Sequence, residues 1–385
     1  MKKLLLAVSL TAAFGLAQAQ SNVSVYGIMD IGVVNATNVG TAGQNATQVL
    51  SSPMWTSRIG FTGTEDLGGG TKTGFKIESQ INPGDGSQGA SSSSGAANNV
   101  FSRAANVYLD NADLGRMTLG RQDNLAFESF AVGDVNAGRN FGGSLNYWND
   151  GSTFGGTSTA KTGLATMTGT TFLSNAVRLD TPVIAGFKGS VQYTTGGVAD
   201  NTTFGALDAS SRRLYALAYT RGAFNGSASY QTSNSAAGLA TAETTTIGGN
   251  YTIDKFKVAA GWANFQNPNG ANASNTDFDL RQVSVKYNAT SKVDVTAGYY
   301  NLKDNISSAN GSQTWSLVGD YNFSKRTTAY IGVASTANKG TSGFAPYGAG
   351  GANYGSLYGT ATYPSVVAST GTTQNAYVVG MTHRF

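Results

Sequence analysis

The sequence predicts an all-β protein, a sixteen-stranded antiparallel transmembrane β-barrel. Segments of about ten residues alternate apolar with polar side chains, which is the periodicity of a strand. The connections alternate between short turns and long loops, as up-and-down hairpins require. Only 12% of the residues are charged, against about 25% in ordinary soluble domains. Gly, Ser, Thr and Asn fill most of the polar positions instead.

The alternating segments can be followed along the whole chain after its first twenty residues. In the first segment, Met29 and Ile31 share one face and Asp30 lies on the other. In the last, Val379 and Met381 alternate with Thr382. We expect strands near residues 22–35, 55–66, 71–81, 102–110, 115–122, 171–181, 185–195, 211–221, 223–232, 243–252, 255–266, 277–288, 291–303, 312–323, 325–336 and 375–385.

The long connections are rich in Gly, Ser, Asn and Thr, and none of them marks a domain boundary. They are expected near residues 36–54, 82–101, 123–170, 196–210, 233–242, 267–276, 304–311 and 337–374. The low-complexity tract from Gly84 to Asn99 lies between two strands and is interpreted as a surface loop. Residues 20–385 therefore form a single domain.

Residues 1–19 have the pattern of a secretory signal peptide. Two lysines precede an apolar stretch from Leu4 to Leu16, and the segment ends in the small-residue pattern A-x-A at Ala17 to Ala19. We expect cleavage before Gln20. Loss of the two lysines lowers the formal net charge from +4 to +2.

A soluble β-sandwich is the alternative to a membrane barrel. Its polar face would meet bulk water and carry many Lys and Glu residues, whereas the polar face here is mostly uncharged. A closed barrel satisfies every backbone group within lipid, which an open sheet does not. Sixteen strands leave an aqueous channel inside. Five aromatic residues are expected in the girdles at the membrane surfaces: Trp262, Tyr299, Trp315, Tyr321 and Phe323.

Composition excludes several other function classes. The chain has no Cys and a single His, His383, close to its end. Thiolate chemistry is therefore absent, and histidine catalysis or a transition-metal site has little to build on. No nucleotide-binding motif is present, and the scattered charges give no nucleic-acid surface. We expect neither an enzyme nor a bound cofactor or transition metal, and the Asp- and Asn-rich outer loops leave a calcium site open.

Several short motifs, taken in order, resemble those of the general diffusion porins of proteobacterial outer membranes, of the Neisseria, Comamonas and Burkholderia type. The resemblance covers essentially the whole chain after the leader. The motifs are SVYGIMDIGV at 24–33, SRIGFTGTEDLGGG at 57–70, LGRQ at 119–122, NAVRLDTP at 175–182, GFKGSVQY at 186–193, SKRTTAYIGVA at 324–334 and VGMTHRF at the end of the chain.

The resemblance implies a sixteen-stranded barrel that assembles as a homotrimer, with the third long loop folded into the lumen. It also implies an outer-membrane location, with membrane lipid and lipopolysaccharide as surroundings. The terminal Phe385 is similar to the assembly signal that the barrel-insertion machinery reads.

The charged residues of the inner face are the candidates for selectivity, because charged rings decide which solutes pass a constriction. By alternation, Arg58, Lys76, Glu78 and Arg178 point inward, and the family commonly places wall arginines in the motifs of Arg58 and Arg178. Two further arginines are candidates although their alternation places them toward lipid, because a bulge near a strand end reverses the faces. These are Arg103 and Arg121.

The third long loop, residues 123–170, carries three more candidates: Glu128, Asp134 and Arg139. If the loop folds inward as in the family, Glu128 and Asp134 face the arginine wall across the bore. If it caps the outside of the barrel, its acids are merely solvated. Gly142 and Gly143 would permit a tight turn.

The leading functional hypothesis is a passive channel for small hydrophilic solutes and ions with a weak preference for anions, because inward-facing bases outnumber acids seven to five. A substrate-specific channel for sugars or organic anions is the main alternative. A secreted adhesin is less favoured because no internal repeat is present. An outer-membrane hydrolase would need a histidine away from the terminus.

Overall fold

The computed structural model describes residues 22–40, 43–88, 100–149, 171–195, 211–234, 240–267, 276–347 and 368–385. The expected leader, residues 1–19, and its cleavage point lie outside these ranges. None of the helices in the described ranges is long and apolar enough to cross a membrane. The strands are β1 (Asn22–Val39), β2 (Gln44–Ser51), β3 (Arg58–Gly68), β4 (Thr71–Gln80), β5 (Ala104–Asn111), β6 (Gly115–Asp123), β7 (Phe172–Asp180), β8 (Phe187–Thr194), β9 (Arg212–Arg221), β10 (Phe224–Asn234), β11 (Ala240–Ile253), β12 (Phe256–Asn267), β13 (Thr276–Asn288), β14 (Val293–Asp304), β15 (Gly311–Asn322), β16 (Thr327–Lys339) and β17 (Thr373–Arg384).

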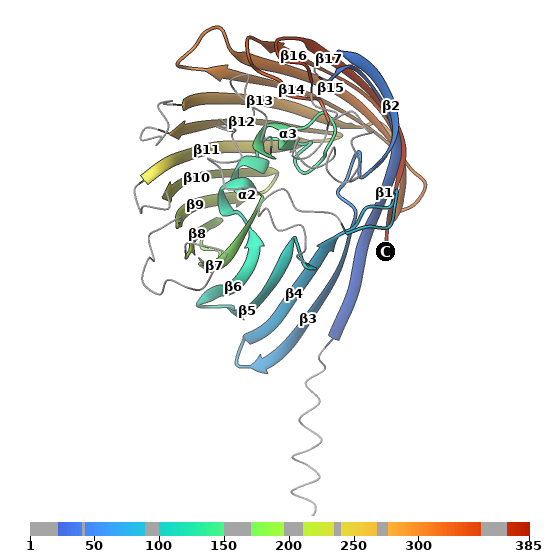
Figure 1. Cartoon of the computed structure of the whole chain (residues 1–385). Coiled ribbons are helices and arrows are strands. Elements are labelled where there is room, and N and C mark those ends of the chain that lie inside the picture. The colour runs from blue at the N-terminus through green and yellow to red at the C-terminus, as the bar shows by residue number, and fades with distance from the viewer. Residues whose placement is uncertain are drawn as a thin grey trace, which may run out of the picture.

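The strands close into an antiparallel barrel (Figure 1). The first part of β1 pairs with β3, from Asn22↔Thr64 to Ile28↔Arg58. Its later part pairs with β17, through Ala36↔Ala376. From β3 onward each strand pairs with the next, so the ring comprises sixteen strands, β1 and β3 through β17. All sixteen expected strands are confirmed, within a few residues at their ends.

A buried carboxylate of β1, that of Asp30, stabilises the junction between the first and last strands of the ring. Asp30 is fully buried, and it accepts hydrogen bonds from the Thr382 hydroxyl of β17, the Tyr330 hydroxyl of β16 at 3.1 Å and the Met54 amide at 3.0 Å. The last residue continues the seam, because the backbone amides of Gly27 and Phe385 each donate to the other's carbonyl. The two ends of the chain are thereby hydrogen-bonded along the junction of β1 and β17.

Strand β2 is a correction to the sequence analysis, which treats residues 36–54 as a loop. Strand β1 continues to Val39, and β2 folds back along it from Val39↔Gln44 to Ile31↔Ser51. Because β2 is composed mostly of polar residues on both faces, its alternation is weak in the sequence. The hairpin lengthens the wall on the side of the long loops without adding a strand to the ring.

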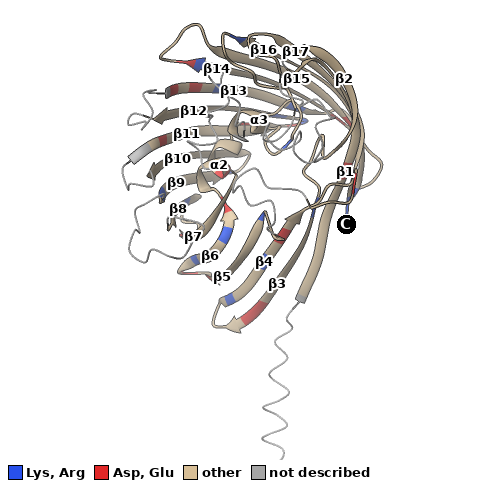
Figure 2. Cartoon of the chain, in the orientation of Figure 1, with Lys and Arg blue, Asp and Glu red and all other residues tan. Residues whose placement is uncertain are grey.

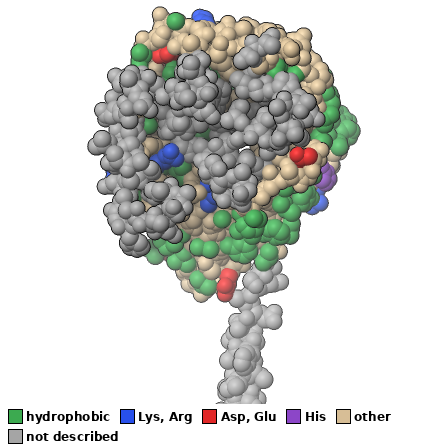
Figure 3. Space-filling view, in the orientation of Figure 1, with side chains coloured by type: hydrophobic (Ala, Val, Ile, Leu, Met, Phe, Trp, Pro, Cys, Tyr) green, Lys and Arg blue, Asp and Glu red, His purple; other side chains and the backbone are tan. Residues whose placement is uncertain are grey.

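The alternation correctly predicts which face meets lipid. On β1, Val23 and Val25 are 61% and 55% exposed, whereas Val34 and Ala36 of the other parity are buried. The outward-facing aromatics Tyr299, Trp315, Tyr321 and Phe323 are exposed as well. Trp262, also outward, is half-buried, and its indole N–H donates to Asp279 at 3.2 Å. Hydrophobic side chains gather over the lower part of the surface in Figure 3.

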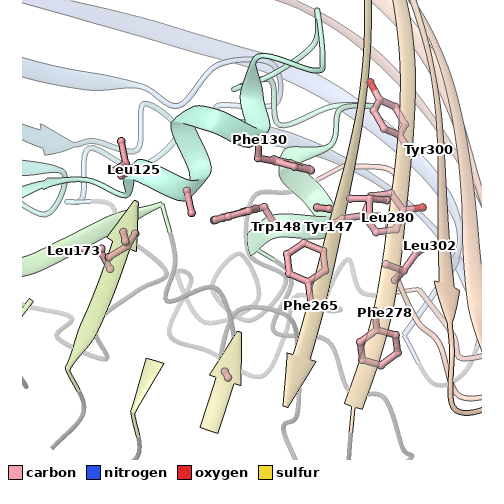
Figure 4. Packing of buried hydrophobic residues seen from close by; sticks show 14 of the residues in the cluster. Leu125, Phe130, Tyr147, Trp148, Leu173, Phe265, Phe278, Leu280, Tyr300 and Leu302 are labelled. Atoms are coloured by element: carbon pink, nitrogen blue, oxygen red, sulfur yellow. The ribbon is translucent and has the colours of Figure 1, made fainter. Parts of the chain in front are cut away.

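Two short helices lie inside the ring (Figure 1): α2 (Leu125–Ala131) and α3 (Leu145–Asn149). Asn124 begins α2, because its Oδ1 accepts from the amides of Ala126 and Phe127. The helices bring Phe130, Tyr147 and Trp148 against apolar residues of the strands (Figure 4). The inward-facing partners on the wall are Leu214, Phe265, Phe278, Leu280 and Leu302.

The interior of the barrel is apolar in this sector. The apolar inner faces of β9 and β12 to β14 are covered by residues 125–149, and the ring centroids of Phe130 and Trp148 lie 5.0 Å apart. Burial of these side chains holds the segment against one side of the wall. Among the described residues, a cavity in the lumen lies on the side of β3 to β8.

Residues 139–142 are tied to two other connections. The amide of Asn140 donates to the Met54 carbonyl at 2.9 Å, and the amide of Gly142 donates to the Pro346 carbonyl at 2.7 Å. Gly142 has a φ of +63° and a Cβ there would lie 2.3 Å from the Ser316 Cβ. The tight turn expected at Gly142 is thus confirmed, and only glycine fits it.

Candidate functional site: charged residues of the inner wall

The first charged group of the lumen, here called the Glu78 cluster, joins Arg58, Lys76, Glu78 and Arg103. Strands β3 and β4 are paired, so Arg58, Lys76 and Glu78 lie on one inner surface as their alternation predicts. One Glu78 oxygen is 2.6 Å from Arg103 Nε and 3.9 Å from Arg58 Nη1, and the other is 3.8 Å from Lys76 Nζ. Three bases thus share one acid.

Tyr26 completes this cluster and was not among the predicted site residues. Its hydroxyl donates to Glu78 Oε2 at 2.8 Å. The sequence shows Tyr26 only as an inward aromatic of the first strand, and its partner lies 52 residues away. With two hydrogen-bond donors and two further bases around it, the Glu78 carboxylate is nearly fully buried, its side chain 4% exposed.

Arg121 extends the basic surface, and the outward orientation that its alternation suggests is wrong. The pairing of β6 with β7 shifts register between Gly120 and Gln122, and this irregularity turns Arg121 away from lipid. Its guanidinium donates to the Ser102 carbonyl at 2.7 Å and to the Ser174 hydroxyl at 2.6 Å. Arg103 likewise turns away from lipid, because it precedes the first paired residue of β5.

Phe172 holds these two arginines near each other. The guanidinium carbons of Arg103 and Arg121 lie 4.6 and 5.8 Å from the centre of its ring. The aromatic face offsets part of the repulsion between two like charges. Arg121 therefore adds a positive charge beside the Glu78 cluster, although it is not one of the bases that pair with Glu78.

The second charged group, here called the Arg178 cluster, connects the wall to α2. Arg178 Nη1 lies 2.8 Å from Glu128 Oε1, and Arg178 Nη2 lies 3.0 Å from Asp180 Oδ1. Lys188 Nζ is 3.7 Å from the same Asp180 oxygen. Two bases and two acids balance here, so this cluster adds little net charge to the lumen.

Glu128 contacts the wall arginine directly, in contrast to the expected separation across the bore. Burial among the wall strands raises the pKa of the Glu128 carboxyl, and the Arg178 guanidinium opposes part of that rise. The nearby Asp123 and Asp180 add to the rise. Glu128 therefore gains a proton more readily on acidification than an ordinary glutamate does.

Asp134 was also expected to face the arginine wall across the bore, and it does not. It is buried, and its oxygens accept from the Tyr300 hydroxyl at 3.0 Å, from the Ser144 hydroxyl at 2.7 Å and from the Asn136 amide at 2.8 Å. The hydrogen bonds of the Asp134 carboxylate stabilise the conformation of residues 134–144 and hold this segment against β14.

Arg139 is also buried, and it contacts the opposite wall. Its Nη2 lies 2.6 Å from Asp320 Oδ2 on β15, and its guanidinium carbon lies 5.6 Å from the Trp55 ring centre. Asp320 is a partner that no sequence pattern indicates, because 181 residues separate the two. Arg139 thus fastens the loop tip to the wall.

A cavity of about 720 Å³ lies in the open sector, between α2 and strands β3 to β8. Lys76 of the Glu78 cluster borders it, as do Arg178, Lys188 and Glu128 of the Arg178 cluster. Arg116 lines its short-turn side and pairs with Asp110 at 2.9 Å. In Figure 2, basic bands mark β4 and β6 at this side of the ring. A solute in this sector passes charged groups of both signs.

A closed barrel with an apolar outer face and a charged inner wall belongs to the transmembrane channels built from strands. The chain matches the family model of Gram-negative porins over residues 5–341, and it belongs to that family. The family and the fold indicate a channel rather than an enzyme.

Similar proteins include two curated relatives and two solved structures. An outer membrane porin protein of Bordetella pertussis is 29% identical over 288 residues, 68% of this chain and 69% of that protein. Outer membrane porin protein 32 of Delftia acidovorans is 28% identical over 347 residues, 89% of this chain and 91% of that protein. An anion-selective porin from Comamonas acidovorans shares the fold with a TM-score of 0.75 and 23% identity, over 95% of this chain and 100% of that one. The trimer form of OmpT from Vibrio cholerae has a TM-score of 0.62 and 13% identity, over 95% of this chain and 99% of that one. The protein is therefore an outer-membrane diffusion channel.

Proposed function

We propose that this porin is a general diffusion channel with a weak preference for anions, and that the Glu78 cluster carries the preference. The supporting observation is that Arg58, Lys76 and Arg103 share the single carboxylate of Glu78. Inside a low-dielectric wall, such an excess concentrates small anions near the pore. The name of the Comamonas neighbour, an anion-selective porin, agrees with this proposal.

Purified protein in planar lipid bilayers tests the proposal. We expect large ohmic conductance steps and a zero-current potential in a KCl gradient that has the sign of chloride preference. Absence of steps would contradict a channel, and a potential of the opposite sign would contradict the assignment of the Glu78 cluster. A substrate-specific organic-anion channel would instead show conductance that saturates as that anion is added.

The proposal extends to assembly. The chain is exported with its leader, which is removed before Gln20, and the barrel-insertion machinery reads Phe385 at its end. The mature barrel associates as a homotrimer, and lipopolysaccharide contacts its outer face. Exposed apolar side chains on the outer faces of β1 and β3 support self-association, because they supply a continuous surface for a second protomer.

A further inference from the structure

The segment between β2 and β3, residues 52–57, lies inside the ring and carries an aromatic side chain, Trp55, to the loop tip. Asn140 of the loop tip donates from its side-chain amide to the Ser52 carbonyl at 2.8 Å. Trp55 itself forms an isolated antiparallel bridge with Arg139. The Trp55 side chain is only half-buried, so part of its ring meets the water of the lumen.

Two guanidinium groups lie against the Trp55 ring. The guanidinium carbon of Arg139 is 5.6 Å from the ring centre, and that of Arg384, the last residue of β17, is 5.5 Å from it. Arg384 has the inward parity of β17, since His383 is exposed on the outer face while Thr382 is buried. Arg384 is thus a base of the lumen that was not among the predicted selectivity residues.

The two arginines differ in how their charge is compensated. Arg139 lies 2.6 Å from Asp320 and forms a buried ion pair with it. Arg384 is half-buried, and among the described residues no carboxylate lies within ion-pair distance of its guanidinium, the terminal carboxylate of Phe385 included. The charge of Arg384 is therefore uncompensated within the part of the chain that the structure describes.

The inward acid closest to Arg384 along the pairing of β1 with β17 is Asp30. It lies opposite Thr382, the inward position next to Arg384. Its oxygens accept from the hydroxyls of Thr382 and Tyr330 and from the Met54 amide. Asp30 is fully buried among these donors and makes no ion pair with Arg384, so it does not take the place of the missing partner.

Arg384 continues the basic surface of the Glu78 cluster across β1. Ile28 of β1 is paired with Arg58 of β3 on one side and with Arg384 of β17 on the other. The end of β17 accordingly lies beside β1 in Figure 1. The amide of Arg384 donates to the Arg326 carbonyl at 2.8 Å, in the short turn between β15 and β16. The basic surface thus extends from the Glu78 cluster toward the short-turn end of the barrel.

An aromatic ring holds a cation in place but leaves its charge intact. The face of Trp attracts a guanidinium through its quadrupole and carries no net charge. A carboxylate at ion-pair distance instead cancels much of the field that a base exerts on a passing ion. Arg384 is held by the first kind of contact and Arg178 by the second, with carboxylates at 2.8 and 3.0 Å.

We propose that Arg384 is a further residue that determines the ion selectivity of this channel, and that Trp55 positions its guanidinium. Small anions in the lumen pass a fixed positive charge at Arg384 in addition to those of the Glu78 cluster. The inference rests on the proposed preference for anions and adds a second source of it on the other side of β1.

Zero-current potentials in a KCl gradient, measured on purified protein in planar bilayers, test the charge of Arg384. Arg384→Gln should lower the chloride-to-potassium permeability ratio at least about twofold, which is the effect of one unit charge on an ion about 8 Å away in water. Arg384→Lys keeps the charge and should stay closer to the wild type. The matched control, Lys325→Gln, removes one exposed charge from the neighbouring short turn and should change the ratio less, because water and salt screen it.

Trp55→Leu tests the positioning role and leaves the last strand unaltered. It should lower the ratio less than Arg384→Gln does, since the guanidinium keeps its charge and loses its fixed place. In the Arg384→Gln background it should add little, because residues that act through each other are not additive. Trp55→Phe retains an aromatic face and should restore most of the wild-type ratio. Full additivity would assign the effect of Trp55 to another contact and overturn the positioning role.

An unchanged ratio in Arg384→Gln, or an equal change in Lys325→Gln, would overturn the proposal. If Arg384→Gln yields no channels, Trp55→Leu decides the question, and an unchanged ratio in that variant overturns the proposal as well. The potential of the wild type tests the proposed function separately. A wild type without chloride preference would contradict that function, and the difference between it and Arg384→Gln would still show whether Arg384 acts on the permeating ions.

Discussion

Individual charges in the lumen differ in how completely they are compensated. Arg178 has two carboxylates within 3.0 Å, whereas Arg58 shares Glu78 with two other bases and lies 3.9 Å from it. Arg116 is paired with Asp110 at the mouth, where both side chains are substantially exposed. Water and salt screen such exposed charges more strongly than charges in the wall.

Arg58→Gln is expected to move the zero-current potential in a KCl gradient toward cation preference. The variant removes one positive charge from the group with the basic excess. The shift should be larger at low salt, because the Debye length is about 30 Å at 0.01 M and about 8 Å at 0.15 M. Arg116→Gln is the control and should move the potential less. An unmoved potential, or equal shifts in the two variants, would place the selective charges elsewhere.

Acidification is expected to increase the preference for anions through Glu128. Because the pKa of this carboxyl is raised, protonation begins at a higher pH than for an ordinary glutamate and removes one negative charge, while Arg178 stays positive. Lowering the pH should therefore move the zero-current potential toward chloride. Glu128→Gln should have this potential already at neutral pH and change less on acidification. Asp113→Asn, in an exposed turn, should retain the wild-type pH dependence. An unaltered pH profile in Glu128→Gln would show that another group titrates.

At the scale of elements, the loop segment and the wall meet through three glycines. Gly248 of β11 and Gly261 of β12 lie opposite each other in register. A Cβ on Gly248 would lie 2.8 Å from Gly133 Cα, and one on Gly261 would lie 3.2 Å from it. The backbone of the loop therefore touches the wall at a place where no side chain intervenes. This contact sets how far residues 125–149 project into the lumen.

Gly248→Val is expected to reduce single-channel conductance. The new side chain cannot occupy the space of the Gly133 backbone, so the loop segment must move away from β11 and into the open sector. Overpacking of this kind costs about 1–3 kcal/mol, which a stable barrel tolerates. Gly249→Val is the matched control, because Gly249 faces outward on the same strand and its nearest contact is 3.3 Å away. Conductance equal to the wild type in Gly248→Val would contradict this role of the contact.

At the scale of the whole molecule, the outer wall around the seam is continuous and apolar. Val23, Val25, Ile31 and Val33 of β1 are exposed, and Val379 of the neighbouring β17 is 55% exposed. Lipid can cover such a surface, and so can another copy of the barrel. Cyclic symmetry suits copies that share one membrane plane.

Unheated protein in mild detergent is expected to have the mass of a trimer, and boiling should convert it to a monomer. Paired charged substitutions on this face, Val25→Lys with Val33→Lys, should favour the monomer, because two buried like charges at the contact are unfavourable. Val258→Lys on the exposed face of β12 is the control and should remain trimeric. A monomeric mass for the unheated wild type would contradict the proposed assembly.

The sequence by itself determined the sixteen strands of the ring, the outward face of each and the inward position of Arg58, Lys76, Glu78 and Arg178. These follow from alternation, because every strand must present apolar side chains to lipid and polar ones to water, and this requirement is local to each strand. The short turns between successive strands also indicated which strands are neighbours in the barrel, because a short turn joins two adjacent antiparallel strands.

The tertiary structure alone decided where the loop segment packs and what its charges contact. Asp134 and Arg139 bind Tyr300 and Asp320, partners more than 160 residues away, and Arg121 turns inward through a shift in register. The inward apolar residues of β9 and β12 to β14, which interrupt the polar inner face, were the one sequence signal of this packing. Such contacts depend on three-dimensional proximity rather than on periodicity, so no pattern along the chain specifies them.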